Sequence, residues 1–108
     1  MASNSELVVT FLYPRKNLTK FDMDYYLKHH IPATEAGWGP LGMTNCIACS
    51  TEEDTEFVIK VITSWKNVAS WDAAKGGKAA SELTADVANF TNVKPVVVVG
   101  QVLGWFTN

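Results

Sequence analysis

The chain has 108 residues, a length typical of one small domain, and 47% of them are hydrophobic, which is enough to build a buried core. Nine basic and eleven acidic residues give a net charge of −2 without a basic cluster, which argues against nucleic acid or an anionic membrane surface as a partner. The first residues lack the basic and apolar regions of a signal peptide, and no apolar run is long enough to span a bilayer, so we expect a cytoplasmic protein.

The chain begins with a predicted strand followed by a helix. The strand covers Glu6–Tyr13, where β-branched and aromatic residues are followed by a proline. After a polar loop, Asp22 can accept the first free backbone N–H groups and so predicts the start of the helix. Pro32 disfavours helical geometry at Ile31, so we expect an end or a kink there and one further turn before Gly37.

Two adjacent histidines on this helix are expected to face different ways. Helical spacing predicts a core-facing stripe made of Met23, Tyr26, Leu27, His30 and Ile31. The solvent-facing side is then formed by Asp22, Tyr25, Lys28 and His29. His30 and Tyr26 therefore bring an imidazole and a phenol to a face that is otherwise apolar.

The second half of the chain contains three more strands and a second helix. Strands are predicted over Leu41–Ser50 and Glu56–Trp65, joined as a hairpin by an acidic turn, and over Lys94–Trp105. The second helix begins at Asn67 and is expected to kink or break at Gly76–Gly77.

The two cysteines spell C-x-x-C but lie within the second predicted strand. Residues three apart on a strand point to opposite faces, so Cys46 and Cys49 cannot form a disulfide without distortion. We expect structural thiols. The sequence has no H-x-x-H or H-E-x-x-H spacing, so no metal site is predicted.

The order β-α-β-β-α-β predicts an α+β, ferredoxin-like fold. A single domain, residues 1–108 with a core of about 6–105, would have a four-stranded antiparallel sheet with both helices on one face. The uncovered face should alternate polar with apolar residues, but Val8 and Leu12 are apolar there and Val96–Val99 is a continuous apolar run. We therefore expect a homodimer whose sheets pack face to face to close an α+β barrel. The alternative is a monomer whose termini cover that face.

Several motifs resemble the EthD family, which is named for a protein linked to ethyl tert-butyl ether degradation. The similar segments are Leu12-Tyr13-Pro14, Phe21-Asp22-x-Asp24-Tyr25-Tyr26, His30-x-Pro32, Asn89-Phe90-Thr91 and Lys94-Pro95-Val96. They are spread over roughly residues 8–102. The resemblance implies a dimeric α+β barrel and does not imply one common reaction.

In this fold a cleft between the first helix and the sheet is the expected ligand site. Its candidate lining residues, some of them alternatives that depend on strand register, are His30 and Tyr26 as catalytic groups and Thr10, Phe11, Asn45, Phe57, Trp65 and Trp71 as substrate-binding groups. An imidazole exchanges protons near neutral pH, and Tyr26 or Asn45 can hold a carbonyl or phenolic oxygen.

These groups suit cofactor-free proton-transfer chemistry on a small apolar, aromatic or polyketide-like molecule, such as dehydration, decarboxylation, cyclisation or isomerisation. Whether the protein is an enzyme stays open, because a non-catalytic binding or accessory protein for a hydrophobic intermediate would need the same cleft. Haem ligation by His30 is a third, fold-level alternative. A hydrogen-bonded core histidine without chemistry is the fourth.

Overall fold

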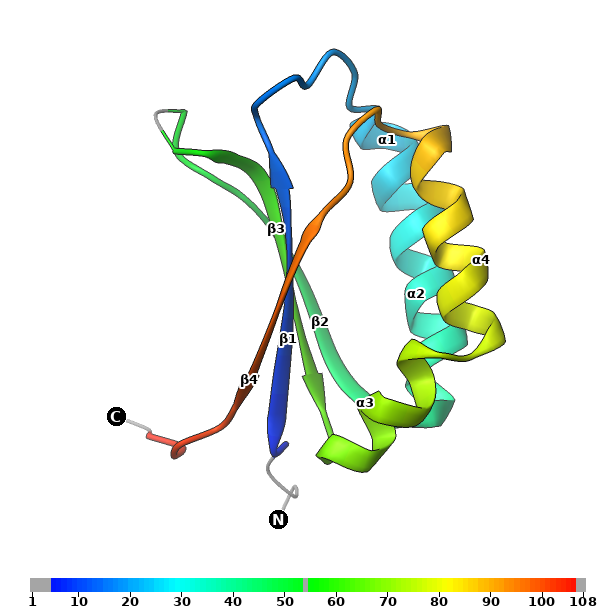
Figure 1. The fold of residues 1–108 in the computed structure, drawn as a ribbon, viewed down its shortest axis with the longest axis vertical. Coiled ribbons are helices and arrows are strands. Elements are labelled where there is room, and N and C mark those ends of the chain that lie inside the picture. The colour runs from blue at the N-terminus through cyan, green and yellow to red at the C-terminus, as the bar shows by residue number, and fades with distance from the viewer. Residues whose placement is uncertain (1–4, 54, 107–108) are drawn as a thin grey trace.

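A computed structural model describes residues 5–53 and 55–106 of the chain. Four strands form one antiparallel sheet in the order β2-β3-β1-β4 (Figure 1). Their bounds are β1 (Leu7–Pro14), β2 (Met43–Ser50), β3 (Phe57–Trp65) and β4 (Val96–Gln101). The predicted α+β, ferredoxin-like order is confirmed.

The last strand is shorter than predicted at both ends. Gln101 pairs with Leu7, the first residue of β1, so the chain beyond it soon has no partner strand. One further backbone bond, from Val102 N–H to the Glu6 carbonyl, ends the ladder at 2.8 Å.

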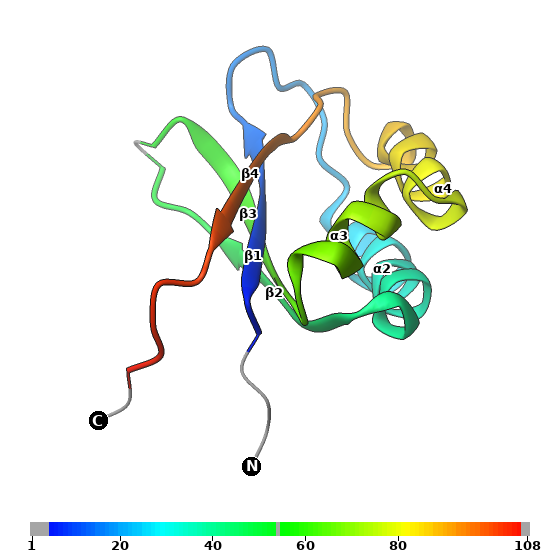
Figure 2. The same ribbon diagram turned by 60° about the horizontal axis from the view of Figure 1, so that its bottom comes forward.

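The helices form a single layer over one face of the sheet (Figures 1 and 2). The first rod consists of α1 (Met23–Tyr25), a wide π-helical turn (Tyr26–His30) and α2 (Ile31–Trp38). The second consists of α3 (Val68–Lys75) and α4 (Lys78–Asp86), separated at the predicted Gly76–Gly77 break. Short 3₁₀ turns follow α2 (Gly39–Leu41) and α4 (Val87–Asn89). Among the described residues, none of the helices has both the length and the apolar character needed to cross a bilayer.

Pro32 changes the first rod without ending it. A proline has no N–H to donate to the carbonyl four residues earlier, and the chain adapts by widening the preceding turn, where Ile31 N–H bonds to the Tyr26 carbonyl. The helix then continues to Trp38. Asp22 caps the start as predicted, because its carboxylate accepts the Tyr25 N–H at 3.1 Å.

The helix stripe predicted from the sequence is partly wrong, because the wide turn changes which residues face the core. Tyr26 and His30 are buried as expected, but Met23 and Leu27 are 39% and 50% exposed. The buried positions recur every four residues, at Tyr26, His30, Thr34 and Trp38. An α-helix advances 3.6 residues per turn, so a four-residue repeat drifts around it, and a wider turn keeps the repeat on one face.

The core between the layers has two halves. The tryptophan cluster contains Leu7, Val9, Trp38, Met43, Trp65, Trp71, Ala74 and Leu83. The tyrosine cluster contains Tyr13, Tyr26, Ile59, Val61, Phe90 and Val93. Phe11 packs against both clusters from the middle of β1, so the two halves meet over the centre of the sheet.

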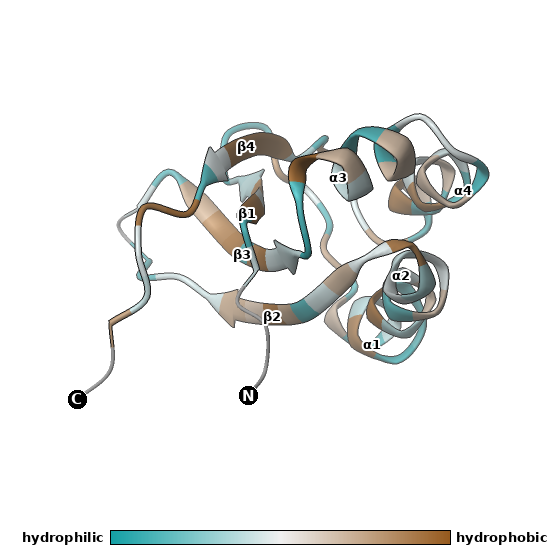
Figure 3. Ribbon diagram, turned by 90° about the horizontal axis from the view of Figure 1, so that it is seen from below, coloured by the Kyte–Doolittle hydropathy of each residue, from teal (hydrophilic) through white to brown (hydrophobic). Residues whose placement is uncertain are grey.

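The other face of the sheet carries no helix (Figure 3). Strand register places Ile47, Ile62, Thr10 and Val98 in one row across all four strands on this outer face. Ile47 and Val98 are 55% and 50% exposed. The predicted apolar second face is therefore present in the monomer.

The cysteines are free thiols on opposite faces of β2, as the strand spacing predicts. Cys46 packs against both halves of the core, whereas Cys49 pairs with Lys60 in the outer-face register. Burial, assisted by the negative charge of Glu35, raises the pKa of the Cys46 thiol to about 11, so it is protonated and unreactive at neutral pH.

Candidate functional site

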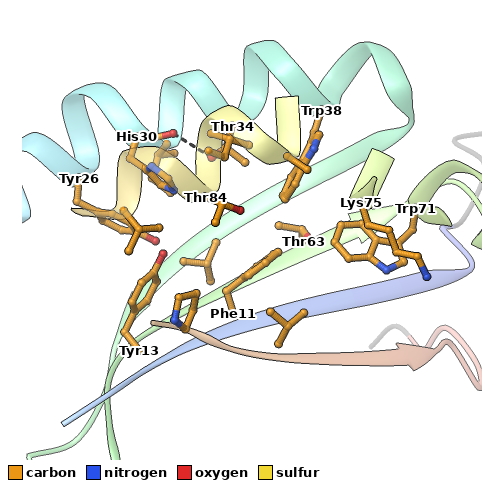
Figure 4. Close-up of a pocket in the computed structure, with 17 residues that line it drawn as sticks. Phe11, Tyr13, Tyr26, His30, Thr34, Trp38, Thr63, Trp71, Lys75 and Thr84 are labelled. Carbon is orange, nitrogen blue, oxygen red and sulfur yellow. Dashed lines mark hydrogen bonds between the residues drawn. The ribbon is translucent and has the colours of Figure 1, made fainter. Parts of the chain in front are cut away.

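A cavity of about 240 Å³ lies between the helical layer and the sheet, where the two core clusters meet (Figure 4). Its walls are mostly aromatic and aliphatic side chains from β1, the first rod, α3 and α4. The volume exceeds the roughly 150 Å³ of an apolar cavity that binds benzene and lies just below the roughly 300–1,000 Å³ usual for drug-sized ligands. It therefore suits a molecule of one or two rings better than a macrocycle such as haem.

Four of the residues predicted from the sequence line this cavity. His30 and Tyr26 come from the wide turn of the first rod, Phe11 from β1 and Trp71 from α3. Because the wide turn places Tyr26 and His30 on the buried side, their rings stack with centroids 5.6 Å apart and an interplanar angle of 17°.

The other four predicted residues do not reach the cavity. Thr10 and Asn45 lie on the outer face, where Thr10 pairs with Ile62 and Asn45 with Ser64. The reason is the alternation of strand side chains, which sends Phe11 inward and its neighbour Thr10 outward.

Phe57 and Trp65 are at the two ends of β3 and away from the cavity wall. Phe57 lies opposite Pro14 at the start of the strand. Trp65 is 0% exposed inside the tryptophan cluster, and its indole N–H donates to the Thr63 hydroxyl at 2.9 Å. Trp65 is therefore a core packing residue, and neither side chain lines the cavity.

Asp86, which sequence reasoning missed, is the partner of His30. Its Oδ2 lies 2.9 Å from His30 Nδ1, across 56 residues of sequence. Its Oδ1 accepts the Tyr25 hydroxyl at 2.5 Å and the Asn89 amide at 2.9 Å. A signal was present in the sequence, since Asp86 lies on the same helical stripe as the apolar residues of α4 and the turn after it.

Tyr25 was predicted to face solvent, and that prediction is wrong. Its ring is half-buried against Phe90, with centroids 6.4 Å apart, and its hydroxyl reaches Asp86. The wide turn that begins at the next residue rotates this position toward the second rod.

The hydrogen bonds around Asp86 keep its carboxylate charged. Burial by itself raises the pKa of this carboxyl, but the bonds from Tyr25, Asn89 and His30 lower it, and the net shift of the pKa is downward. An ionised carboxylate only accepts hydrogen bonds, so the proton of the neutral His30 ring is on Nδ1. The second nitrogen, Nε2, is left as an acceptor, and within residues 5–53 and 55–106 no hydrogen bond engages it.

The orientation of the imidazole is fixed by aromatic contacts as well. The Phe90 ring lies 4.7 Å from the His30 ring and Tyr26 stacks on it. His30 is 7% exposed and is one of the residues lining the cavity. The arrangement holds the imidazole in one orientation at the wall of an apolar cavity.

Two phenols stand near the imidazole. Tyr13 and Tyr26 meet edge to face with ring centroids 5.9 Å apart, and Figure 4 places both hydroxyls at the His30 end of the cavity. Burial raises the pKa of both, with the charge of Asp86 adding to the effect on Tyr13 and the neighbouring Tyr13 adding to that on Tyr26. They are therefore neutral hydrogen-bond donors, suited to an oxygen atom that gains negative charge.

The opposite end of the cavity has a different chemistry. Trp38, Trp71 and Lys75 lie there in Figure 4, away from His30. Trp38 and Trp71 meet nearly at right angles with centroids 5.5 Å apart. Trp38 and Lys75, like Tyr13, were not among the residues predicted from the sequence.

Solved structures with the same fold include two EthD proteins. An EthD-like protein from Ralstonia eutropha is 23% identical, with a TM-score of 0.72 over 94% of this chain and 96% of that one. An ethyl tert-butyl ether degradation (EthD) family protein from Bacillus halodurans is 14% identical, with a TM-score of 0.70 over 91% of this chain and 99% of that one. The resemblance to the EthD family seen in the sequence is thus confirmed at the level of the fold.

A third similar structure is a variant of SnoaB from Streptomyces nogalater, described as a cofactor-independent oxygenase. It is 10% identical, with a TM-score of 0.65 over 99% of this chain and 100% of that one. No protein-family model matches the sequence, and no curated protein matches it. At these identities the likeness establishes the shared fold.

Proposed function

Since the chain has the fold of the EthD-like proteins, we propose that its cavity binds a small aromatic or polyketide-like molecule and that His30 moves a proton on it without a cofactor. The observation that carries the proposal is the pairing of His30 with Asp86 behind an apolar cavity. Asp86 holds the Nδ1–H tautomer and stabilises the imidazolium that forms when Nε2 accepts a proton.

The reaction class follows from the groups at that end of the cavity. Nε2 of His30 removes a proton from carbon, and the electron pair moves to a substrate oxygen that becomes an enolate or phenolate. The neutral hydroxyls of Tyr13 and Tyr26 are suited to stabilise that oxygen by hydrogen bonding. Return of the proton to another atom completes an isomerisation, and loss of water completes a dehydration or cyclisation.

The base can be tested without knowing the natural substrate. In the Kemp elimination of 5-nitrobenzisoxazole a base removes the C3 proton, the N–O bond breaks and a coloured phenolate forms. The rate of this single deprotonation can therefore be measured from the absorbance of the phenolate. We expect wild-type protein to accelerate this reaction and His30→Gln to lose about 100-fold or more of the rate.

A matched control is His29→Gln, because His29 belongs to the same wide turn as His30 but is exposed. It should keep the wild-type rate. Equal rates for wild type and His30→Gln would contradict the assignment of His30 as the base.

The alternative, a non-catalytic carrier of a hydrophobic intermediate, is favoured by the apolar lining of the cavity. It predicts that the purified protein binds small aromatic molecules while 5-nitrobenzisoxazole reacts no faster than in a solution of free imidazole. Native mass spectrometry of protein isolated from cells is the measurement that identifies a carried molecule.

We further propose that the working form is a homodimer joined through the outer face of the sheet. The apolar row across the strands, with Ile47 and Val98 about half exposed, supports a second copy as the covering surface, because a two-fold contact needs one self-complementary patch.

Light scattering after size exclusion should give twice the chain mass. The double substitution Ile47→Lys and Val98→Lys should give the chain mass, whereas Glu82→Lys on the helical side should not. A monomeric wild type would contradict the proposal.

A further inference from the structure

Two buried hydroxyl groups have no hydrogen-bond partner, and both belong to residues that line the cavity. Tyr13 and Tyr26 are 3% and 1% exposed, and neither hydroxyl is hydrogen-bonded within residues 5–53 and 55–106. The other buried hydroxyls of the described residues are all paired, and they belong to Ser5, Thr34, Thr63 and Thr91. Because a buried polar group without a partner is costly, two of them in one place indicate a site for a ligand atom.

Both hydroxyls are open to the cavity. Among the described residues, Trp38 Nε1 is the only buried side-chain nitrogen or oxygen that lacks both a hydrogen-bond partner and accessible surface. The hydroxyls of Tyr13 and Tyr26 also lack a partner, so they differ from this indole in having accessible surface. Figure 4 shows the two side chains reaching toward one another at the His30 end of the cavity, Tyr13 from the sheet and Tyr26 from the first rod. A ligand atom at this end can therefore contact them.

The two hydroxyls can serve one ligand oxygen. Their rings lie 5.9 Å apart between centroids, and the nearness of Tyr13 is one of the causes that raise the pKa of Tyr26. Because the pKa of each phenol is raised, both keep their protons at neutral pH and act as donors. A carbonyl oxygen has two lone pairs, so it can accept a hydrogen bond from each tyrosine.

The imidazole of His30 stands beside this pair. Tyr26 stacks on it with ring centroids 5.6 Å apart. A ligand held by its carbonyl oxygen thus brings the carbon next to the carbonyl group toward His30. The proton on this carbon is acidic, because its loss places the electron pair on the oxygen that the tyrosines bind.

We infer that the substrate is an enolisable ketone of one or two rings, bound with its carbonyl oxygen at Tyr13 and Tyr26. The apolar walls of the cavity accept the rings, and the two hydroxyls find in the ketone the acceptor that the described residues do not supply. Both hydrogen bonds strengthen as the oxygen becomes negatively charged, so the enolate is held more tightly than the ketone. The inference deepens the proposed function, on which it rests for the removal of the proton by His30.

The first test compares 2-tetralone with tetralin, which have the same two fused rings and differ by one carbonyl oxygen. Affinities are measured by equilibrium dialysis. We expect wild-type protein to bind the ketone about 20-fold more tightly than the hydrocarbon, because each hydrogen bond contributes about fivefold. Tyr13→Phe and Tyr26→Phe should each weaken ketone binding by about fivefold, and the double variant should bind both molecules equally. Tetralin is the matched control, since phenylalanine keeps the ring and should leave its affinity unchanged.

A stability measurement shows whether these hydroxyls are unpaired in the protein without ligand. Removing a hydroxyl that has no partner should cost nothing, so the two single variants should be at least as stable to urea as wild type. A marked loss of stability in either variant would mean that its hydroxyl is already hydrogen-bonded and would overturn its assignment to the ligand.

A second test follows the reacting carbon by proton NMR in D₂O. His30 removes a proton from C1 of 2-tetralone, the electron pair moves to oxygen, and a deuteron that the imidazole gains from the solvent returns to C1. The ketone is recovered with a C–D bond and no other reactant is consumed. Wild type should accelerate this exchange, and the double tyrosine variant should lose about 100-fold of the rate.

The outcomes separate the inference from the proposed function. Equal affinity of wild type for ketone and hydrocarbon, or a preference that persists in the double variant, overturns the inference and leaves an apolar binding site. No binding of either molecule overturns both. A preference that depends on the tyrosines, together with equal Kemp elimination rates for wild type and His30→Gln, supports the recognition of the oxygen and removes the catalytic role.

Discussion

The two halves of the core use aromatic residues for different purposes. In the tryptophan cluster Trp38, Trp65 and Trp71 pack edge to face at 5.1–5.5 Å, and none of the eight residues of the cluster is an acid or a base. In the tyrosine cluster the rings surround His30, and Asp86 stands behind it. The difference indicates that the tryptophan cluster supplies stability and an apolar wall of the cavity, while the tyrosine half adds groups that exchange protons.

The largest effect is expected from truncation in the tryptophan half. Trp65→Ala removes a side chain that is 0% exposed, and we expect it to lower the free energy of unfolding by about 3–5 kcal/mol. Because no ionisable group bonds to this indole, the loss should be the same at pH 5 and pH 8. Urea unfolding followed by circular dichroism measures it. A loss that varies with pH would contradict the division of the core into two chemically distinct halves.

A smaller, pH-dependent effect is expected from Asp86→Asn in the other half. Because the pKa of Asp86 is lowered in the folded protein, its carboxylate stabilises the fold above the ordinary pKa of about 3.9, and that stability is lost as the pH falls through the lowered value. We expect the variant to be about 1–2 kcal/mol less stable than wild type at pH 7, with the difference shrinking below about pH 4. Glu82→Gln, exposed on the same helix, should change neither value.

The same variant distinguishes a positioning residue from a purely structural one. Asp86→Asn should slow the Kemp elimination by about tenfold or more and shift the His30 proton between its two nitrogens, which imidazole ¹⁵N spectra report. A rate equal to wild type with the Nδ1–H tautomer preserved would show that Asp86 does not hold the imidazole.

The smallest effect is expected from Tyr25→Phe. This change removes the hydroxyl that donates to Asp86 at 2.5 Å, and one of the bonds that lower the pKa of that carboxyl is lost. We expect the Asp86 pKa to rise toward its ordinary value and the stability at pH 7 to fall by less than it does in Asp86→Asn, since the bonds from Asn89 and His30 remain. Carboxyl ¹³C titration of wild type and variant measures the pKa. An unchanged value would leave Asn89 and His30 as the groups that keep Asp86 ionised.

Two sequence patterns with a local physical cause, a helix cap and a helix break, predicted the structure correctly, whereas the helical stripe placed Met23 and Leu27 wrongly. Asp22 caps a helix because its own carboxylate reaches an N–H three residues later. Gly76 is the residue at which α3 ends and Gly77 the residue at which α4 begins, so the break falls on the predicted glycine pair. The alternation of Thr10 and Phe11 was readable as well, but which of them faced the helices was not. That choice depends on the pairing of β1 with β3 and β4.

The sequence by itself determined the order of helices and strands, the cap at Asp22 and the presence of His30 and Tyr26 on a buried face, because these depend on neighbours within a few residues. Only the tertiary structure decided that His30 meets Asp86, that Tyr25 turns toward the second rod and that Trp65 is packed away from the hollow. The physical reason is distance along the chain: His30 and Asp86 are 56 residues apart, and they meet only because the two rods lie side by side over one sheet (Figure 1).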